Sequence, residues 1–185
     1  MAIPKSEQYN TFEDFLILAE TSQERMEYIN GEIVYLAAPT TLHQRIVGKI
    51  FVKISNYISQ NHGKCEPFVA PFDVQLGKNQ VQPDVLVVCD PEEKLTDKKC
   101  IGAPDWIIEV VSSNYWNDYF RKLELYKNSG VREYWIVDPE EEKVLVYFFE
   151  QNNNVILFYD FTQPIPVNIY KDAPVQLSIC ISELL

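Results

Sequence analysis

Two acidic residues stand inside runs of apolar residues, where ionised side chains are rare. Asp84 opens the run Asp84-Val85-Leu86-Val87-Val88, and Glu109 interrupts the run Trp106-Ile107-Ile108-Glu109-Val110-Val111. An acid is almost never fully buried unless it is paired or bound to a metal ion. Both acids therefore need a partner, which makes them the first candidates for a functional site.

Two carboxylates held close together create a site for a proton or a cation. At a separation of about 4 Å, two unit charges repel by about 4 kcal/mol at an effective dielectric constant of about 20. One carboxylate must then take up a proton, or a cation must lie between them. Carboxylate oxygens suit Mg²⁺ or Mn²⁺, and the chain has no cluster of Cys and His residues that would indicate zinc.

A lysine follows on the next predicted helix, which runs from about Tyr115 to Asn128. Asp118 and Lys122 are four residues apart, so they lie on one face of that helix. One interpretation is a surface ion pair that contributes about 0.5 kcal/mol. The other places Lys122 at the metal site, where it orients or activates a water molecule. The spacing leaves both open.

The strands that carry the two acids are predicted to be central strands of a sheet. Runs that are apolar on both alternating faces are typical of strands covered on both sides, and residues 133–137 form a third such run. On the second strand, Ile107, Glu109 and Val111 share a face. If the strands of Asp84 and Glu109 are neighbours, the two carboxylates converge near one edge of the sheet.

An Asn30-Gly31 pair between two alternating runs predicts a β-hairpin over residues 25–36. A two-residue turn pairs Ile29 with Glu32 and Glu27 with Val34, and it places both acids on one face. These acids are either solvated charges at a sheet edge or members of the site.

The rest of the chain mixes helices and strands without strict alternation. A helix capped by Thr11 precedes the hairpin and a helix over residues 41–61 follows it. His43, near the start of the second helix, is either a cap or surface group or a site residue. Further strands are expected over residues 68–76, 143–149 and 155–161, with a short strand or turn in the tail from residue 163 to 185.

This order of elements predicts an α/β (mixed α+β) fold, with a central mixed β-sheet flanked by helices and extra hairpins near both ends. The 185 residues fit one domain. It would comprise an N-terminal helix and hairpin (1–40), a core (41–140) and a C-terminal hairpin and tail (141–185).

Composition limits the classes of function. The net charge of −11 argues against a sequence-independent nucleic-acid binder, whose affinity comes mostly from Lys and Arg. No apolar run approaches the roughly 20 residues of a membrane span, and the first five residues lack the apolar core of a signal peptide. The four cysteines contain no CxxC pair, so reduced thiols and a cytoplasmic location are expected.

Taken in order, these residues resemble a known family. Its motifs are matched by Pro83-Asp84, Ile108-Glu109-Val110 with Ser112, Asp118, Lys122, Tyr126, Gly130-Val131 and the block Glu133-Tyr134-Trp135-Ile136-Val137-Asp138-Pro139. The family is the Uma-two type of proposed restriction endonucleases, a branch of the PD-(D/E)XK phosphodiesterase superfamily. Glu27, Asn30-Gly31-Glu32 and His43 match the family's opening, so the resemblance covers about residues 12–140. It implies a restriction-endonuclease-like core with the site at one edge of the sheet.

The resemblance also implies roles for individual residues. Asp84 would be the first metal ligand and Glu109 the second, with the backbone carbonyl of Val110 or Val111 as a further ligand. The superfamily places a lysine two residues after the second acid, but this chain has Val111 there. Lys122 of the following helix is therefore the candidate for the catalytic lysine.

The activity implied is hydrolysis of DNA phosphodiester bonds assisted by Mg²⁺ or Mn²⁺. Glu27 or Glu32 would complete a second metal position, and His43 and Asp118 would be accessory residues. A homodimer follows by analogy, because cutting both strands is easiest with two sites about a twofold axis.

Three alternatives remain open from the sequence. The first is a catalytically inactive domain of the same fold that binds DNA or protein, which the acidic charge favours. The second is a metal-dependent hydrolase of small phosphates. The third is a structural domain in which Glu109 and Lys122 form a buried ion pair.

Overall fold

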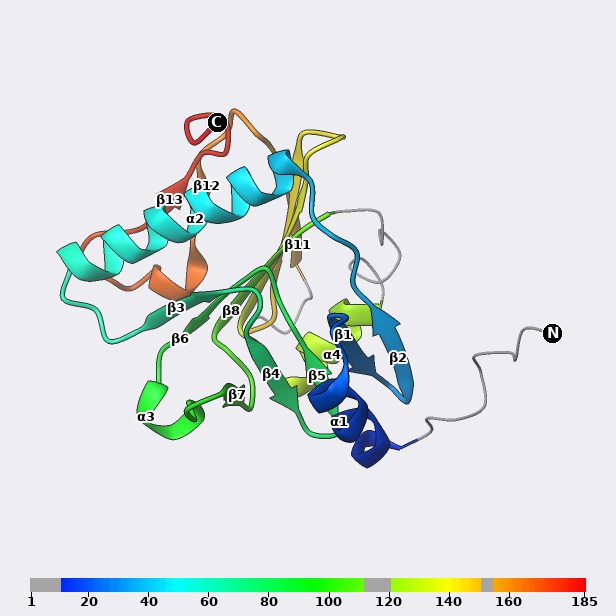
Figure 1. Ribbon diagram of the computed structural model, residues 1–185. Helices are drawn as coiled ribbons and strands as arrows, with labels where there is room; N and C mark the ends of the chain where they lie inside the picture. The colour runs from blue at the N-terminus through cyan, green and yellow to red at the C-terminus, as the bar shows by residue number, and fades with distance from the viewer. Residues whose placement is uncertain (1–10, 112–120, 151–154) are drawn as a thin grey trace.

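Strands and helices follow one another irregularly along the chain (Figure 1). The computed structural model describes residues 11–111, 121–150 and 155–185. The helices are α1 (Phe12–Thr21), α2 (Thr41–Gln60), α3 (Pro91–Lys94) and α4 (Lys122–Ser129), and a short 3-10 helix, η2, spans Asn168–Tyr170. The strands are β1 (Met26–Ile29), β2 (Glu32–Tyr35), β3 (Glu66–Val69), β4 (Asp73–Leu76), β5 (Asn79–Val81), β6 (Val85–Val88), β7 (Lys99–Ile101), β8 (Trp106–Val110), β9 (Glu133–Asp138), β10 (Lys143–Phe148), β11 (Val155–Asp160), β12 (Ile165–Pro166) and β13 (Ser178–Ile179).

Most strands belong to two mixed sheets. The first has six strands in the order β11-β10-β9-β8-β6-β3, of which only β8 and β9 run parallel to each other. The second has five strands in the order β2-β1-β5-β4-β7 and contains the N-terminal hairpin. The predicted mixed fold is confirmed, but its strands divide between two sheets where a single one was expected.

The six-stranded sheet is covered on both faces. On one face, α2 and the C-terminal segments with β12 and β13 pack against β6, β8 and β9 (Figure 1). On the other face, α4 and strands of the five-stranded sheet pack against the same three strands. Every residue of β6, β8 and β9 is buried, including both acids of β9 and Glu109 of β8. The prediction that these apolar runs form central strands is therefore confirmed.

Short-range sequence patterns predicted the N-terminal helix and hairpin correctly. The side-chain oxygen of Thr11 accepts a hydrogen bond from the Asp14 amide and caps α1. The hairpin has Ile29 opposite Glu32 and Glu27 opposite Val34, as the two-residue turn predicts. Asn30 and Gly31 both have positive φ, at 51° and 89°, which is the conformation that this turn requires.

The strand expected over residues 68–76 is wrong. Residues 66–69 form β3 at the edge of the six-stranded sheet, and residues 73–76 form β4 in the other sheet. Pro71 lies between them and has no amide hydrogen to donate to a ladder, so the chain leaves one sheet there and enters the next. The run that was predicted as one strand therefore contains two strands, separated at Pro71.

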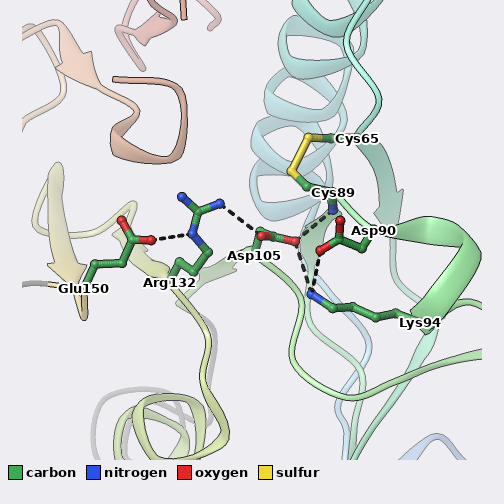
Figure 2. The surroundings of a disulfide bond; sticks show 7 residues. All are labelled: Cys65, Cys89, Asp90, Lys94, Asp105, Arg132 and Glu150. Carbon is green, nitrogen blue, oxygen red and sulfur yellow. Dashed lines mark hydrogen bonds and ion pairs between the residues drawn. A yellow bond between two sulfur atoms is a disulfide. The ribbon is translucent and has the colours of Figure 1, made fainter. Parts of the chain in front are cut away.

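The expectation of four reduced cysteines is also wrong, because Cys65 and Cys89 form a disulfide. Glu66 of β3 lies opposite Val88 of β6, and one further step in this register brings the two cysteines together. Cys100 and Cys180 are free and buried. Figure 2 shows the Cys89 amide donating to the buried carboxylate of Asp105, which also pairs with Lys94 and Arg132.

The helix expected over residues 115–128 is described from residue 121 onward, where α4 begins at Lys122. It ends at Gly130, whose φ of 93° is the left-handed conformation that terminates many helices. In the described part of the chain, no helix has both the length and the apolar character needed to cross a membrane.

Candidate active site

Asp84 and Glu109 meet because their strands are neighbours. Strand β6 pairs antiparallel with β8, and Val85 lies opposite Ile108. One further step in the same register places Asp84 opposite Glu109. Two acids separated by 24 residues in sequence are thus brought to one end of the β6–β8 pair.

One oxygen of Asp84 is held and the other is left to solvent or a ligand. Asp84 Oδ2 accepts a hydrogen bond from the backbone amide of Val110 at 2.8 Å and lies 3.1 Å from Nε2 of His43. Asp84 Oδ1 has no partner in the described part of the chain. His43 is positioned by α2, where the hydroxyl of Thr40 accepts from the His43 amide and caps the helix.

Lys122 joins two buried carboxylates. Its Nζ donates to Glu109 Oε1 and to Glu27 Oε1, each at 2.9 Å, and all three side chains are less than 5% exposed. The Tyr126 hydroxyl also donates to Glu109 Oε1, at 2.7 Å. Lys122 and Tyr126 are four residues apart on α4, so one face of this helix supplies both donors.

Glu27 lies in the N-terminal hairpin, and a backbone amide holds one of its carboxylate oxygens. Its Oε1 accepts from the backbone amide of Gln82 at 2.8 Å in addition to Lys122. Its Oε2 is buried and has no hydrogen-bond partner among the described residues. Two carboxylates, from Glu27 and Glu109, thus flank one lysine, and Asp84 lines the same pocket as this lysine. The excess of negative charge favours a bound cation.

These groups border a pocket with a volume of about 60 Å³. Asp84, Glu109 and Lys122 all line it, together with His43 and Val110. The buried ion pair between Glu109 and Lys122 therefore exists, but it lies at the wall of a pocket and not in a closed apolar core. The pocket is also lined by Arg25, Leu36, Ala37, Pro39, Gln44, Val47, Ala70 and Gln82.

The structure separates the remaining candidates. Glu27 reaches the site through Lys122, whereas Glu32 is exposed and forms an ion pair with Arg121 away from the pocket walls. Asp118 lies outside the described residues. Where side chains are described, no three Asp, Glu, His or Cys residues form a group that could hold a metal ion without other donors. Any metal would need oxygens from the backbone, water or substrate beside Asp84 and Glu109.

Three further residues of the site carry little signal in the sequence. Tyr126 belongs to the family motif, and its spacing of four residues from Lys122 places the two on one face of α4. Arg25 and Gln82 line the pocket without any local pattern that signals it. Both lie beside the second sheet, and its contact with the site depends on tertiary structure.

A family model described as "Putative restriction endonuclease", named Uma2, matches residues 12–172. This chain belongs to the Uma2 family. The family membership inferred from the motifs is confirmed. The Uma2 match extends well beyond residue 140, so it includes the β10–β11 hairpin and η2.

Two proteins similar to this chain come from Synechocystis sp. and Anabaena variabilis. The "Uncharacterized protein slr1290" of Synechocystis sp. is 27% identical over 139 residues, which are 73% of this chain and 72% of that protein. A crystal structure of a "putative nuclease belonging to DUF820" from Anabaena variabilis superimposes with a TM-score of 0.76 at 23% identity. The superposition covers 94% of this chain and 96% of the Anabaena variabilis chain, so this Uma2 protein shares that fold over nearly its full length.

Proposed function

We propose that this protein is a metal-dependent endonuclease that hydrolyses DNA phosphodiester bonds. The observation that carries the proposal is that Asp84, Glu109 and Lys122, from two strands and a helix, line one pocket. Membership of a family described as "Putative restriction endonuclease" and a fold shared with a protein described as a "putative nuclease" support it.

Asp84 and Glu109 would hold Mg²⁺ or Mn²⁺, with the backbone carbonyl of Val110 as a further oxygen donor. The residues fit such an ion because hard carboxylate oxygens are its preferred ligands and Asp84 Oδ1 has no protein partner among the described residues. When bound, the divalent cation polarises the phosphoryl group and lowers the pKa of a water molecule that it holds.

The other residues would position these groups. The Val110 amide and His43 fix the orientation of Asp84, and Tyr126 fixes that of Glu109. Lys122 would orient the attacking water and offset negative charge that develops on the phosphate. Glu27 would hold Lys122 in place, and its Oε2, which has no hydrogen-bond partner in the described part of the chain, is the candidate donor for a second cation.

The proposal includes one domain over residues 1–185, a homodimer and a cytoplasmic location, although the Cys65–Cys89 disulfide is a bond that the reducing cytoplasm disfavours. Two copies related by a twofold axis would present two pockets to the two strands of a duplex. Sedimentation velocity with and without a DNA duplex measures the oligomeric state.

The test is cleavage of plasmid DNA in Mg²⁺ or Mn²⁺ by the wild type and by Asp84→Ala. Loss of Asp84 should lower the rate by about 100-fold or more, the scale typical of removing an electrostatic group from a reacting centre. Asp97→Ala removes an exposed acid beyond the far end of β6 and serves as the control. Equal rates for Asp84→Ala and the wild type would exclude this site.

Two results would favour the alternatives. Inactivity of the wild type on plasmid and on single-stranded DNA, with binding retained, favours a non-catalytic domain. Hydrolysis of nucleotides or other small phosphates without cleavage of DNA favours a small-phosphate hydrolase.

A further inference from the structure

Arg25 contributes a cation to the pocket that pairs with no carboxylate among the described residues. It directly precedes β1 and lines the same pocket as Asp84 and Glu109. Its Nε donates to the side-chain oxygen of Gln82 at 3.0 Å, which is a neutral partner. Arg25 forms no ion pair with any carboxylate in the described part of the chain.

The other two basic residues of the pocket differ in this respect. Lys122 pairs with Glu27 and Glu109, and His43 lies against Asp84. The protein has 27 acidic residues against 16 Lys and Arg, so a nearby carboxylate partner would be easy to supply. A half-buried arginine held only by an amide is therefore suited to an anion that comes from outside the chain.

A chain of hydrogen bonds fixes the direction of this arginine. The Gln82 side-chain nitrogen donates to Asp73 Oδ1 at 2.9 Å, which turns the amide oxygen toward Arg25. Asp73 Oδ2 in turn accepts from the Gln80 side chain at 3.0 Å. The backbone carbonyl of Arg25 accepts from the Leu36 amide at 3.0 Å. Both the main chain and the side chain of Arg25 are thus held before any ligand arrives.

Arginine is well suited to phosphate. Its guanidinium group has five N–H donors in a rigid fork, and using Nε for Gln82 leaves the two terminal nitrogens free to bind two phosphate oxygens. A phosphate that approaches Asp84, Glu109 and Glu27 meets negative charge. A fixed cation beside them lowers this repulsion without displacing Lys122 from its carboxylates.

We propose that Arg25 binds non-bridging oxygens of a phosphodiester group of the strand that enters the pocket, with Gln82 and Asp73 as positioning residues. The assignment rests on the proposed function, because it takes the pocket to be the place where a DNA strand is bound. It adds a substrate-binding residue to the acids and the lysine that the family motifs provide.

The test measures binding without turnover. Fluorescence anisotropy of a short labelled DNA duplex in EDTA, and NMR titration with dimethyl phosphate, report the affinity for a long and a minimal phosphodiester. Arg25→Gln should weaken both by about tenfold or more, because a charge-assisted bidentate contact is lost. Lys98→Gln removes one exposed charge on the loop before β7 and should change neither by more than about twofold.

Two further variants separate charge from orientation. Arg25→Lys keeps the charge but not the fork, and Gln82→Met keeps the arginine but not its anchor, so each should show an intermediate loss of affinity. Thermal unfolding of the variants should stay close to that of the wild type, since the side chains of Arg25 and Gln82 are only half-buried. A wild type that binds neither probe, or an Arg25→Gln variant that binds both normally, overturns the proposal.

Plasmid cleavage distinguishes this failure from failure of the proposed function. Normal cleavage and binding by Arg25→Gln would remove Arg25 from the site but leave the nuclease in place. Binding that depends on Arg25, in a wild type that cleaves no DNA, would leave a phosphodiester-binding site without nuclease activity.

Discussion

Lys122 lies on the same face of the sheet as Val111, which occupies the position where the superfamily pattern places a lysine. Glu109 lies in β8 and Val111 directly follows this strand, where its amide still donates to the Val137 carbonyl, so the two side chains emerge on the same face. Residues of α4 pack on that face beside Ile107. A lysine from α4 therefore approaches Glu109 from the side on which a lysine at position 111 would lie. The change of position in sequence leaves the pairing of acid and lysine intact.

The buried network around Lys122 makes a prediction about stability. Lys122→Met leaves Glu27 and Glu109 buried without their cation, and removing one partner of a buried ion pair destabilises by about 3–5 kcal/mol. Urea unfolding at neutral pH measures this loss. Lys127→Met, on the same helix and without an ion pair among the described residues, is the matched control.

Two results would settle the role of Lys122. Adding Glu27→Gln to Lys122→Met should recover part of the lost stability, because one of the two uncompensated charges is removed. If Lys122→Met were as stable as Lys127→Met, the buried ion pairs could not be present in solution.

The C-terminal tail is anchored to β9 by a buried acid. Glu133 accepts hydrogen bonds from Trp135 Nε1 at 2.7 Å and from the Ile169 amide at 2.9 Å. It is fully buried and has no positively charged partner among the described residues. Burial raises the pKa of the Glu133 carboxyl to about 7, although the hydrogen bonds from Trp135, Ile169 and Asn168 act in the opposite direction.

This raised pKa predicts how stability depends on pH. The ordinary pKa of a glutamate is near 4.5, so between that value and about 7 the folded protein binds the proton that the unfolded chain releases. Stability contributed by protonated Glu133 is complete below the lower value and is lost as pH rises through the upper one. The free energy of unfolding of Glu133→Gln should therefore increase relative to that of the wild type by about 3 kcal/mol as the pH rises from about 4.5 to about 7.

Denaturant unfolding of both proteins across this range measures the difference. Glu66→Gln, at an exposed position of β3, reports the general effect of losing one acid. A constant difference between Glu133→Gln and the wild type at all pH values would show that Glu133 titrates alike in the folded and unfolded chains.

Across the whole molecule, local signals predicted elements well and long-range contacts poorly. The Asn30-Gly31 turn, the Thr11 cap and the apolar runs of β6, β8 and β9 depend on neighbouring residues, so the sequence alone revealed them. The second sheet joins β1 to β5, whose paired residues Tyr28 and Gln80 are far apart in sequence. Without that pairing, neither Glu27 behind Lys122 nor Arg25 in the pocket could be placed.

The disulfide shows the same limit and leads to a prediction for the whole chain. Cys65 and Cys89 are separated by 24 positions and become neighbours only when β3 pairs with β6. A cross-link of this length restricts the unfolded chain, so its reduction should lower the free energy of unfolding by about 3 kcal/mol. Urea unfolding with and without a phosphine reductant measures this change.

The double variant Cys65→Ala, Cys89→Ala should be insensitive to the reductant, because Cys100 and Cys180 are free thiols. A wild type that is equally stable in both conditions would show that the two cysteines are not linked.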